Sequence, residues 1–485
     1  MKISEQLLTT PKEQNNALFV DGQHYTYEQL KKAACAIADQ LGKDNAKIGI
    51  LSYRNIEYFA SVFGCIITNR TFIPLGVKFP IKRLISIIEQ SGLKHIIYSP
   101  SYADIVEQLI QYLPHVTFCA IDTAFIEASL QMTIEVEKLE NNALAYIMFT
   151  SGSTGSPKGV PISFSNLASY SNYMTKYLGL TYQDKVSQVF DPTFDLSIHD
   201  MLITWLSGAC LYVIPEVAML APGKFIKKHE LTVWFSVPST AAIMAKLGML
   251  KQNAYPLLRF SLFCGEPLPV DLAKQFQLAA PNSKVINLYG PTEATIACSQ
   301  HVFDSTRAYA HSYVPIGEPF EHMTMVADAQ GELLISGEQV FCGYLNNKRK
   351  TQESIKCHQE KTYYHTGDVV KHNDLGELEY ISRLDDQVKI QGYRVELAEI
   401  DTVSKALLNN PLVQSIAYPK AIPQFIALFI CGQADKNIEQ QLITSLKSKL
   451  PSYMIPKKVI WLDTMPLNSN GKIDKLVLHA TLENI

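Results

Sequence analysis

The stretch "AYIMFTSGSTGSPKGVPIS" (residues 145–163) decides how the rest of the chain is interpreted. An apolar, strand-like segment leads directly into a loop with Gly152, Gly155, four hydroxyl residues and a lysine. Glycine lets the backbone turn close to a ligand, and successive N–H groups and hydroxyls can surround an anion. The loop therefore predicts a phosphate-binding site, with a polar surface hairpin as the alternative.

This loop fits neither of the two common nucleotide-binding patterns. The pattern GxxxxGK[ST] needs a second glycine five residues after the first, but Pro157 follows Gly152 and Val160 follows Gly155 at that spacing. The loop is also not a GxGxxG turn opening a helix. A lysine directly after proline, Lys158, favours a polyphosphate ligand.

Length and composition limit the class of protein. A chain of 485 residues is too long for one hydrophobic core, so we expect two or more domains. Its 47% apolar and 18% charged residues are typical of a soluble globular protein, and its net charge of −3 without a basic stripe argues against nucleic acid as a partner.

The sequence has no run of 18 apolar residues and no secretion signal, so we expect a cytoplasmic protein with no membrane insertion. The nine cysteines form no CxxC pair, which predicts reduced thiols.

Apolar, β-branched runs alternate with helical periods along the first 300 residues or so. Residues 47–53, 71–76 and 94–99 are predicted strands, and residues 56–68 and 80–92 are predicted helices. This alternation predicts an α/β fold with a largely parallel sheet, arranged as two stacked α/β units. Period-two alternation from about residue 310 predicts an antiparallel, β-rich subdomain. We therefore expect a large N-terminal domain (1–384) and a small, mobile α+β C-terminal domain (385–485), joined near Asp385.

Four further stretches follow the glycine-rich loop in a fixed order. They are "NLYGPTEAT" (287–295), "YYHTGD" (363–368), "LEYISRLDDQVKIQGYRVELAEI" (378–400) and "PLNSNGKIDK" (466–475). Together with "FTSGSTGSPKGV" (149–160) they resemble the motif series of adenylate-forming enzymes, which include acyl-CoA synthetases, luciferases and amino-acid adenylation domains. The resemblance covers nearly the whole chain. It implies that a carboxylate and ATP form an acyl-adenylate and pyrophosphate.

The resemblance also implies an ATP site. Tyr289 would stack on adenine, Asn287 would bind its edge, and Asp368 and Arg383 would hold the ribose. Lys158 would add positive charge at the phosphates. The implied ATP-binding residues are Thr150, Ser151, Gly152, Ser153, Thr154, Gly155, Lys158, Gly265, Glu266, Pro267, Asn287, Leu288, Tyr289, Gly290, Pro291, Thr292, Asp368, Tyr380, Arg383 and Lys472.

Catalytic roles follow from the same resemblance. Lys472 and Thr154 are implied as catalytic residues, with Lys472 reaching the α-phosphate and the substrate carboxylate. Glu293 is implied as a ligand of Mg²⁺, which prefers a few carboxylates together with phosphate oxygens. Asp385 matches the family's hinge, at which the small domain would rotate and withdraw Lys472 for a second step. In that step a thiol attacks the acyl-adenylate.

Each of these residues also has an ordinary structural explanation. Asp368 after glycine is typical of an Asx turn, and Glu293 of a helix start favoured by the dipole. Tyr289 would be a core residue, and Lys472 a solvated surface charge. Only the ordered series of motifs favours the catalytic interpretation.

The segment "FDPTFDLSIHDM" (190–201) bears on the substrate. In the amino-acid branch of the family an aspartate in this motif pairs with the substrate ammonium group, and Asp195 matches it. A buried aspartate needs a partner, and an ammonium group supplies one. A helix cap is the alternative role. The implied substrate-binding residues are Asp195, Leu196, His199, Phe235, Leu262, Cys264, Leu288, Ile296, Ala297 and Lys472.

Mostly bulky, apolar residues at these positions predict a small amino acid. The run "FCGEPLPVDLAKQF" (263–276) resembles stand-alone D-alanine–carrier-protein ligases, in which a cysteine at the position of Cys264 shapes the choice of enantiomer. This resemblance favours D-alanine. His199 departs from that group, where methionine is expected, and Phe235 and Leu288 are larger than usual there, so glycine, L-alanine, serine and proline are alternatives.

Two alternatives remain for the overall activity. Only thirteen residues follow Lys472, so the expected acyl acceptor is the phosphopantetheine thiol of a separate carrier protein, with CoA as the alternative. The chain could instead be an acyl-CoA synthetase for a non-amino acid. A non-catalytic member that binds nucleotide and scaffolds a partner is the other possibility.

Overall fold

The structure is a computed structural model that describes residues 2–41, 47–130, 143–152, 156–358, 361–420, 423–468 and 473–483. The chain divides into two compact units. The first comprises Met1–Val77, Ile88–Met148 and Gly159–Leu384, and the second comprises Lys78–Ile87, Phe149–Lys158 and Asp385–Ile485. The division into domains of residues 1–384 and 385–485 stays a prediction, because two earlier segments cluster with the second unit. None of the described helices is long and apolar enough to cross a bilayer.

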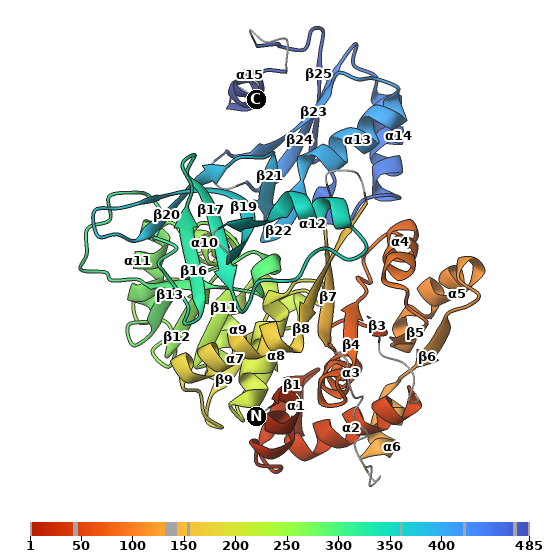
Figure 1. Ribbon diagram of the computed structural model, residues 1–485, viewed down its shortest axis with the longest axis vertical. Helices are drawn as coiled ribbons and strands as arrows, with labels where there is room; N and C mark the ends of the chain where they lie inside the picture. The colour runs from red at the N-terminus through yellow and green to blue at the C-terminus, as the bar shows by residue number, and fades with distance from the viewer. Residues whose placement is uncertain are drawn as a thin grey trace. The chain divides into compact units, whose positions relative to one another are not determined.

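A nine-stranded sheet forms one layer of the first unit (Figure 1). Its central strands are parallel, and the pairs β13–β14, β14–β15 and β1–β2 are antiparallel. β10, β11 and β12 are buried at every position, as expected for parallel strands covered on both faces. In spatial order the strands are β15 (Glu318–Pro319), β14 (Ser299–Val302), β13 (Lys284–Tyr289), β12 (Phe260–Phe263), β11 (Val233–Ser236), β9 (Lys185–Gln188), β10 (Cys210–Val213), β1 (Asn16–Val20) and β2 (Gln23–Thr26).

A second, six-stranded sheet has its pairs β3–β4, β3–β5, β4–β7 and β5–β6 in parallel. The helix α3 (Ile56–Ile67) packs on β3 and β4, and all twelve of its residues are buried. A mostly apolar helix that is buried on every side belongs in a core, and its Glu57 accepts from the hydroxyl of Thr123 at 3.1 Å. The side chain of Asn55 caps its first turn. In spatial order the strands are β6 (Thr117–Ala120), β5 (His95–Tyr98), β3 (Lys47–Leu51), β4 (Thr71–Pro74), β7 (Leu144–Thr150) and β8 (Lys158–Ser163).

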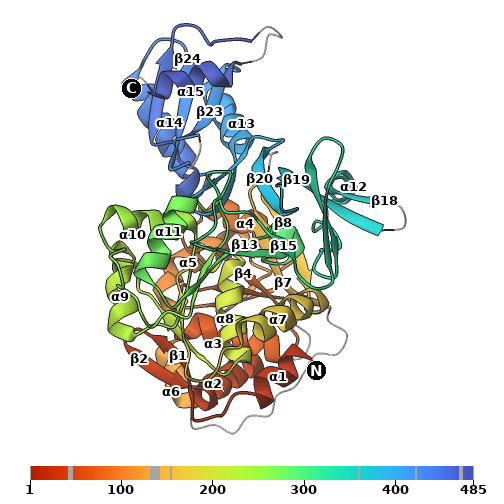
Figure 2. The same cartoon turned by 90° about the vertical axis from the view of Figure 1, so that its left-hand side faces the viewer.

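The other helices of the two α/β layers pack around these sheets. α8 (Leu196–Leu206) packs on β9 and β10, and α1 (Ile3–Thr9) contacts both α3 and α8. Figure 2 shows α9, α10 and α11 together on one side of the unit. The remaining elements are α2 (Tyr27–Gln40), α4 (Ile81–Ser91), η1 (Pro100–Tyr102), α5 (Ala103–Tyr112), α6 (Thr123–Ser129), α7 (Phe164–Leu178), η2 (Glu216–Leu220), α9 (Pro222–His229), α10 (Pro238–Lys246), α11 (Val270–Ala279) and η3 (Thr292–Ala294).

A five-stranded antiparallel sheet completes the first unit. Its strands are β16 (Met323–Ala327), β17 (Glu332–Gly337), β18 (Ile355–His358), β19 (Lys361–His372) and β20 (Leu378–Arg383), with α12 (Lys348–Ser354) before β18. One hydrophobic cluster runs from α1 and both large sheets to Leu333, Ile335 and Leu378 of this sheet. The prediction of a mixed α/β fold is confirmed, and the five elements predicted between residues 47 and 99 are all present, shorter by up to two residues at an end.

The second unit has its own core around Ile400, Leu428 and Leu446. The hairpin of β21 (Gln387–Ile390) and β22 (Tyr393–Glu396) precedes a sheet in which β23 pairs with β24 antiparallel and β24 with β25 parallel. The remaining elements are α13 (Leu397–Leu408), β23 (Val413–Tyr418), β24 (Phe425–Cys431), α14 (Lys436–Lys447), η4 (Ser452–Met454), β25 (Lys458–Leu462) and α15 (Lys475–Glu483).

Candidate active site

The segment 190–201 contains three aspartates, and the structure gives each a different environment. Asp191 forms an Asx turn, since its Oδ1 accepts from the backbone N of Thr193 at 2.9 Å and from its Oγ1 at 2.6 Å. Burial raises the pKa of Asp200 well above its usual range, partly offset by the Arg54 guanidinium and the Val189 amide. Burial therefore favours the neutral form of Asp200.

Asp195 is the remaining aspartate of this segment. It is only 7% exposed and directly precedes α8. Its side chain makes no capping hydrogen bond to that helix, so the alternative role as a helix cap is wrong. Asp195 is therefore the carboxylate of this segment that best suits a cationic substrate.

Two tyrosines and a histidine lie around Asp195. Burial and then the charge of Asp195 raise the pKa of Tyr146. Burial is also the main cause of the raised pKa of Tyr170, with Cys264 and then Asp195 adding to it. The Tyr170 hydroxyl lies 2.6 Å from Nδ1 of His199, and the imidazole packs edge-on against Phe235, with ring centroids 4.7 Å apart. Burial lowers the pKa of His199 to about 3, so its ring is neutral at pH 7. The neutral imidazole of His199 therefore adds no positive charge that would repel an ammonium group.

Phe235, Leu262 and Leu288, three of the other predicted substrate residues, lie near the ends of neighbouring strands of the nine-stranded sheet. Phe235 of β11 pairs with Leu262 of β12, and Leu262 pairs with Ile286 of β13. Ligands of open α/β sheets bind at the carboxyl ends of such strands. The predicted residues are all buried, namely Leu196, His199, Phe235, Leu262, Cys264, Leu288, Ile296 and Ala297.

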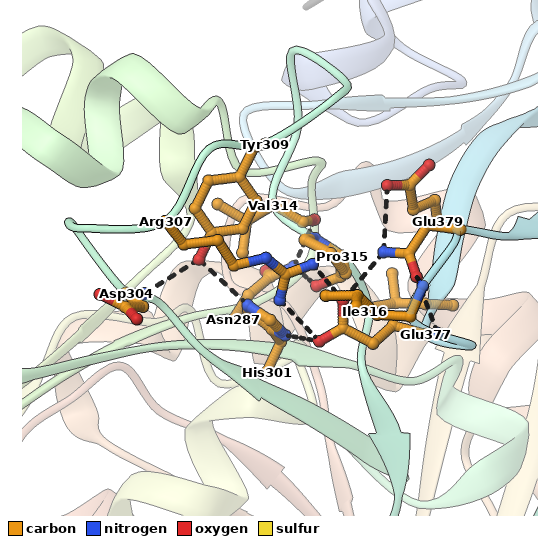
Figure 3. A network of polar contacts seen from close by, with 12 residues as sticks. Asn287, His301, Asp304, Arg307, Tyr309, Val314, Pro315, Ile316, Glu377 and Glu379 are labelled. Atoms are coloured by element: carbon orange, nitrogen blue, oxygen red, sulfur yellow. Dashed lines mark hydrogen bonds and ion pairs between the residues drawn. The ribbon is translucent and has the colours of Figure 1, made fainter.

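Asn287 has a fixed orientation at the end of β13. Its Nδ2 donates to the carbonyl oxygens of Val314 at 3.2 Å and Pro315 at 2.9 Å (Figure 3). Among the residues that the structure describes, no group donates to its Oδ1, although the residue is 3% exposed. A buried acceptor of this kind suits the 6-amino group of adenine.

Gly265 and Glu266, which are predicted to line the adenine, follow β12, the strand that pairs with β13. Phe263, at the end of β12, pairs with Asn287. Gly265 follows with φ +91°, and a side chain there would approach Val237 to 3.3 Å. Glu266 accepts from the backbone N of Ser239 at the start of α10. At Gly290 an added Cβ would lie 2.5 Å from Cα of Ala297, so only glycine fits.

Asp368 is held between two of the other predicted nucleotide-binding residues. Its Oδ2 accepts from the hydroxyl of Tyr289, and its Oδ1 lies 2.6 Å from an Nη of Arg383. Arg383 and Asp368 are also register partners in β20 and β19. The carboxylate is therefore not an Asx turn, and each oxygen keeps a lone pair that a ribose hydroxyl could use. Tyr380 lies on β20 and is half-buried against the main core.

Glu293 lies in the short helix η3 and is fully buried. Its Oε1 accepts from the hydroxyl of Tyr344 at 2.7 Å. A buried carboxylate that already has one neutral donor fits Mg²⁺, which takes oxygen ligands and would offset the negative charge of polyphosphate oxygens. Its role as a metal ligand stays a prediction.

The described part of the glycine-rich loop belongs to the second unit. The hydroxyl of Ser151 donates to the Arg394 carbonyl at 2.8 Å, the N–H of Gly152 donates to Glu399 at 3.2 Å, and Lys158 pairs with Glu396 at 3.1 Å. Two carboxylates thus lie where the sequence predicts phosphates. Ser153, Thr154, Gly155 and Lys472 lie outside the described residues, so their predicted roles are not tested.

Comparisons with known proteins identify the family of this chain. Residues 5–345 match the family described as "AMP-binding enzyme". The chain belongs to the AMP-binding enzyme family. It is 31% identical to a D-alanine–D-alanyl carrier protein ligase of Streptococcus equi subsp. equi, over 93% of each chain, and 28% identical to one of Bacillus licheniformis. The crystal structure of the Vibrio cholerae adenylation domain AlmE with glycyl-adenosine-5'-phosphate is 31% identical, with a TM-score of 0.87 over 100% of this chain and 97% of that one.

As a member of this family the chain is an AMP-forming, adenylating ligase. Sequence reasoning missed several residues of its site, among them Tyr146, Tyr170 and Gln339. Gln339 is fully buried and its Nε2 donates to the carbonyl of Ala297 at 2.7 Å. It supports a turn in which Thr295 and Ile296 both have positive φ, a costly conformation for β-branched residues. No motif marks Gln339, because its partners are backbone carbonyls about 40 residues earlier.

Proposed function

We propose that this ligase activates a small amino acid as its aminoacyl-AMP and then transfers the aminoacyl group to the phosphopantetheine thiol of a separate carrier protein. In the first step a carboxylate oxygen attacks the α-phosphorus of ATP, and pyrophosphate leaves. In the second step the thiol attacks the acyl carbon, and AMP leaves. The observation that carries the proposal is Asp195, a buried carboxylate without a capping role beside neutral side chains.

The nucleotide half of the proposal rests on Asn287 and Asp368. Asn287 offers an acceptor to the 6-amino group of adenine, and Asp368 offers acceptors to the ribose hydroxyls. Glu293 is proposed to bind Mg²⁺. Catalysis in such a site depends on positioning and on neutralising charge at phosphorus. Lys472 and Thr154 are proposed for that neutralisation, and rotation at Asp385 between the two steps stays a prediction.

Two substrates have specific support. D-alanine is favoured by the D-alanine–D-alanyl carrier protein ligases that are 28–31% identical over most of this chain. Glycine is the second candidate, because the structure of the Vibrio cholerae relative contains a glycyl-adenylate. The buried rings of His199 and Phe235 also favour the smaller amino acid.

The test is ATP–pyrophosphate exchange with glycine, both enantiomers of alanine and of serine, and proline, with acetate and propionate as carboxylates that lack the amino group. We expect exchange above background with glycine or D-alanine and none with acetate or propionate. Exchange with the plain carboxylates alone would instead support an acyl-CoA synthetase. Loading of a phosphopantetheinylated carrier protein, compared with CoA, then identifies the acceptor.

Replacing His199 with methionine is expected to raise the ratio of D-alanine to glycine activation by about tenfold or more. The substitution replaces the imidazole, which contacts both Tyr170 and Phe235, with a flexible, narrower side chain and so leaves more space for the methyl group of alanine. One methyl group is worth about 1–3 kcal/mol in a pocket. The measurement is kcat/KM for each amino acid in the exchange assay. Tyr170→Phe is the matched control, because it deletes the hydrogen bond and keeps the volume of the histidine. An unchanged ratio in His199→Met would show that the ring does not limit the space for substrate.

A further inference from the structure

The segment between β14 and β15 (residues 303–317) binds to the β19–β20 hairpin through charged and polar side chains (Figure 3). Arg307 of this segment binds Glu377 of the hairpin with both ends of its guanidinium group, at 2.9 and 2.5 Å. The guanidinium also lies over the ring of Tyr309, 4.9 Å from its centroid. A two-point contact of this kind fixes orientation as well as distance.

His301 extends the contact to a third and fourth side chain. Its Nδ1 lies 3.2 Å from Glu377, and its Nε2 lies 3.2 Å from the hydroxyl of Tyr309, which accepts from the backbone N of Asp304. The contacts assign one proton arrangement, in which Tyr309 donates to Nε2 and the Nδ1–H donates to Glu377. We refer to His301, Arg307, Tyr309 and Glu377 as the clasp.

The charge states agree with that arrangement. The hydrogen bond from Arg307 lowers the pKa of Glu377 to about 2, so this carboxylate is ionised at neutral pH. Burial lowers the pKa of His301, with Arg307 adding to the effect and Glu377 opposing it. The clasp therefore contains one ion pair and a neutral imidazole.

The same segment supplies the two carbonyl groups that orient Asn287. Val314 and Pro315 accept from its Nδ2, and the next residue, Ile316, donates its backbone N–H to the Leu378 carbonyl at 2.9 Å. The segment is thus attached to the hairpin at Arg307 and again at Ile316. His311 of the segment also lies 3.1 Å from Glu379 of the hairpin, and Val314 donates its backbone N–H to the Leu268 carbonyl at 2.8 Å, so Arg307 is one of several contacts that set the position of the two carbonyls.

We propose that the clasp is a positioning device for base selection, which keeps the Asn287 amide oriented to accept from a 6-amino purine and so excludes 6-oxo purines. This proposal rests on the proposed function only in placing the base at Asn287. A side-chain amide can present either its oxygen or its NH₂ group. In this protein the NH₂ group of Asn287 donates to the carbonyls of Val314 and Pro315, so the amide oxygen is the atom that faces the base. If the clasp opens, the carbonyls can shift, and the amide can turn its NH₂ group towards a 6-oxo base.

The test compares the affinities for ATP and for inosine triphosphate (ITP), which has oxygen in place of the 6-amino group. Calorimetric titration of the full chain without any amino acid gives the two Kd values, so the result does not depend on which acid is activated. We expect the wild-type protein to bind ATP much more tightly than ITP. The amide oxygen of Asn287 can accept from the 6-amino group of ATP but would face the 6-oxygen of ITP, which is also an acceptor. In Arg307→Gln and in Glu377→Gln, we expect the ratio of the ITP Kd to the ATP Kd to fall at least about tenfold. The double variant should match the single ones, since either change opens the same pair.

Arg349→Gln is the matched control. Arg349 pairs with Glu353 at 3.0 Å on α12, but its side chain is 92% exposed and has no part in the clasp. It should leave the ratio unchanged. Arg307→Lys, which keeps the charge and loses the two-point contact, provides a milder variant if the others do not fold. The proposal is overturned if folded clasp variants keep the wild-type ratio, if they lose both nucleotides equally, or if the wild-type protein does not prefer ATP. A background result in the amino-acid exchange panel with a normal ATP preference would count against the proposed function and leave the clasp intact.

Discussion

Replacing Asp195 with asparagine is expected to lower kcat/KM for the amino acid by about a hundredfold to about five-thousandfold. Asparagine has nearly the same shape, so the packing of this buried position is preserved while its negative charge is lost. Removing one partner of a buried ion pair costs about 3–5 kcal/mol, and each 1.36 kcal/mol is tenfold in rate. The measurement is ATP–pyrophosphate exchange, with the KM for ATP determined in parallel.

Asp191→Asn is the control for this prediction. It makes the same change of charge four residues earlier, and the Oδ1 of asparagine can still accept from Thr193. We expect near wild-type exchange and an unchanged melting temperature in this variant. Equal losses in the two variants, or an Asp195→Asn protein that activates its amino acid normally, would refute the role of Asp195 as the ammonium partner.

Replacing Asp368 with alanine is expected to raise the KM for ATP by about a hundredfold or more. The carboxylate is 8% exposed and contacts Tyr289 and Arg383, so its loss leaves the buried hydroxyl of Tyr289 without its acceptor and removes the ion pair of Arg383, which still donates to the Thr366 carbonyl. Leaving a buried hydroxyl unpaired costs about 1–3 kcal/mol. The ribose hydroxyls would lose their acceptor in addition. Exchange assays at varied ATP measure the effect, and the KM for the amino acid should change much less.

Asp374→Asn offers the matching comparison in the same hairpin. Asp374 is exposed at the turn between β19 and β20, so its charge can change without affecting a buried group. It should leave the KM for ATP unchanged. Asp368→Asn is an intermediate case, because it keeps one acceptor oxygen. An Asp368→Ala protein with a normal melting temperature and a normal KM for ATP would show that the ribose binds elsewhere.

Local patterns were sufficient to predict much of the fold. The mostly apolar segment 56–68 has helical spacing and predicted a helix, and α3 begins directly after its capping Asn55. The alternation of strands and helices between residues 47 and 99 predicted β3 to β5 because period and length act within a few residues. The antiparallel sheet of β16 to β20 was likewise indicated by period-two alternation and turn glycines.

Contacts between distant segments were not predictable in the same way. Strand order in the nine-stranded sheet follows from packing of the whole chain, and β9 lies between β10 and β11 without any local signal for it. The environments of Asp191, Asp195 and Asp200 differ because each meets different partners, although all three look alike in sequence. The segments of the clasp are likewise about 70 residues apart, at Arg307 and Glu377.

By itself, the sequence was enough to predict the class of fold, the family and a set of candidate site residues, because periodicity and ordered motifs are local properties. Only the tertiary structure decided that Asp195 does not cap its helix, that His199 is neutral, and that Asn287 presents its oxygen. The physical reason is that burial and hydrogen-bond partners set charge and orientation, and both come from segments that meet only in the folded chain.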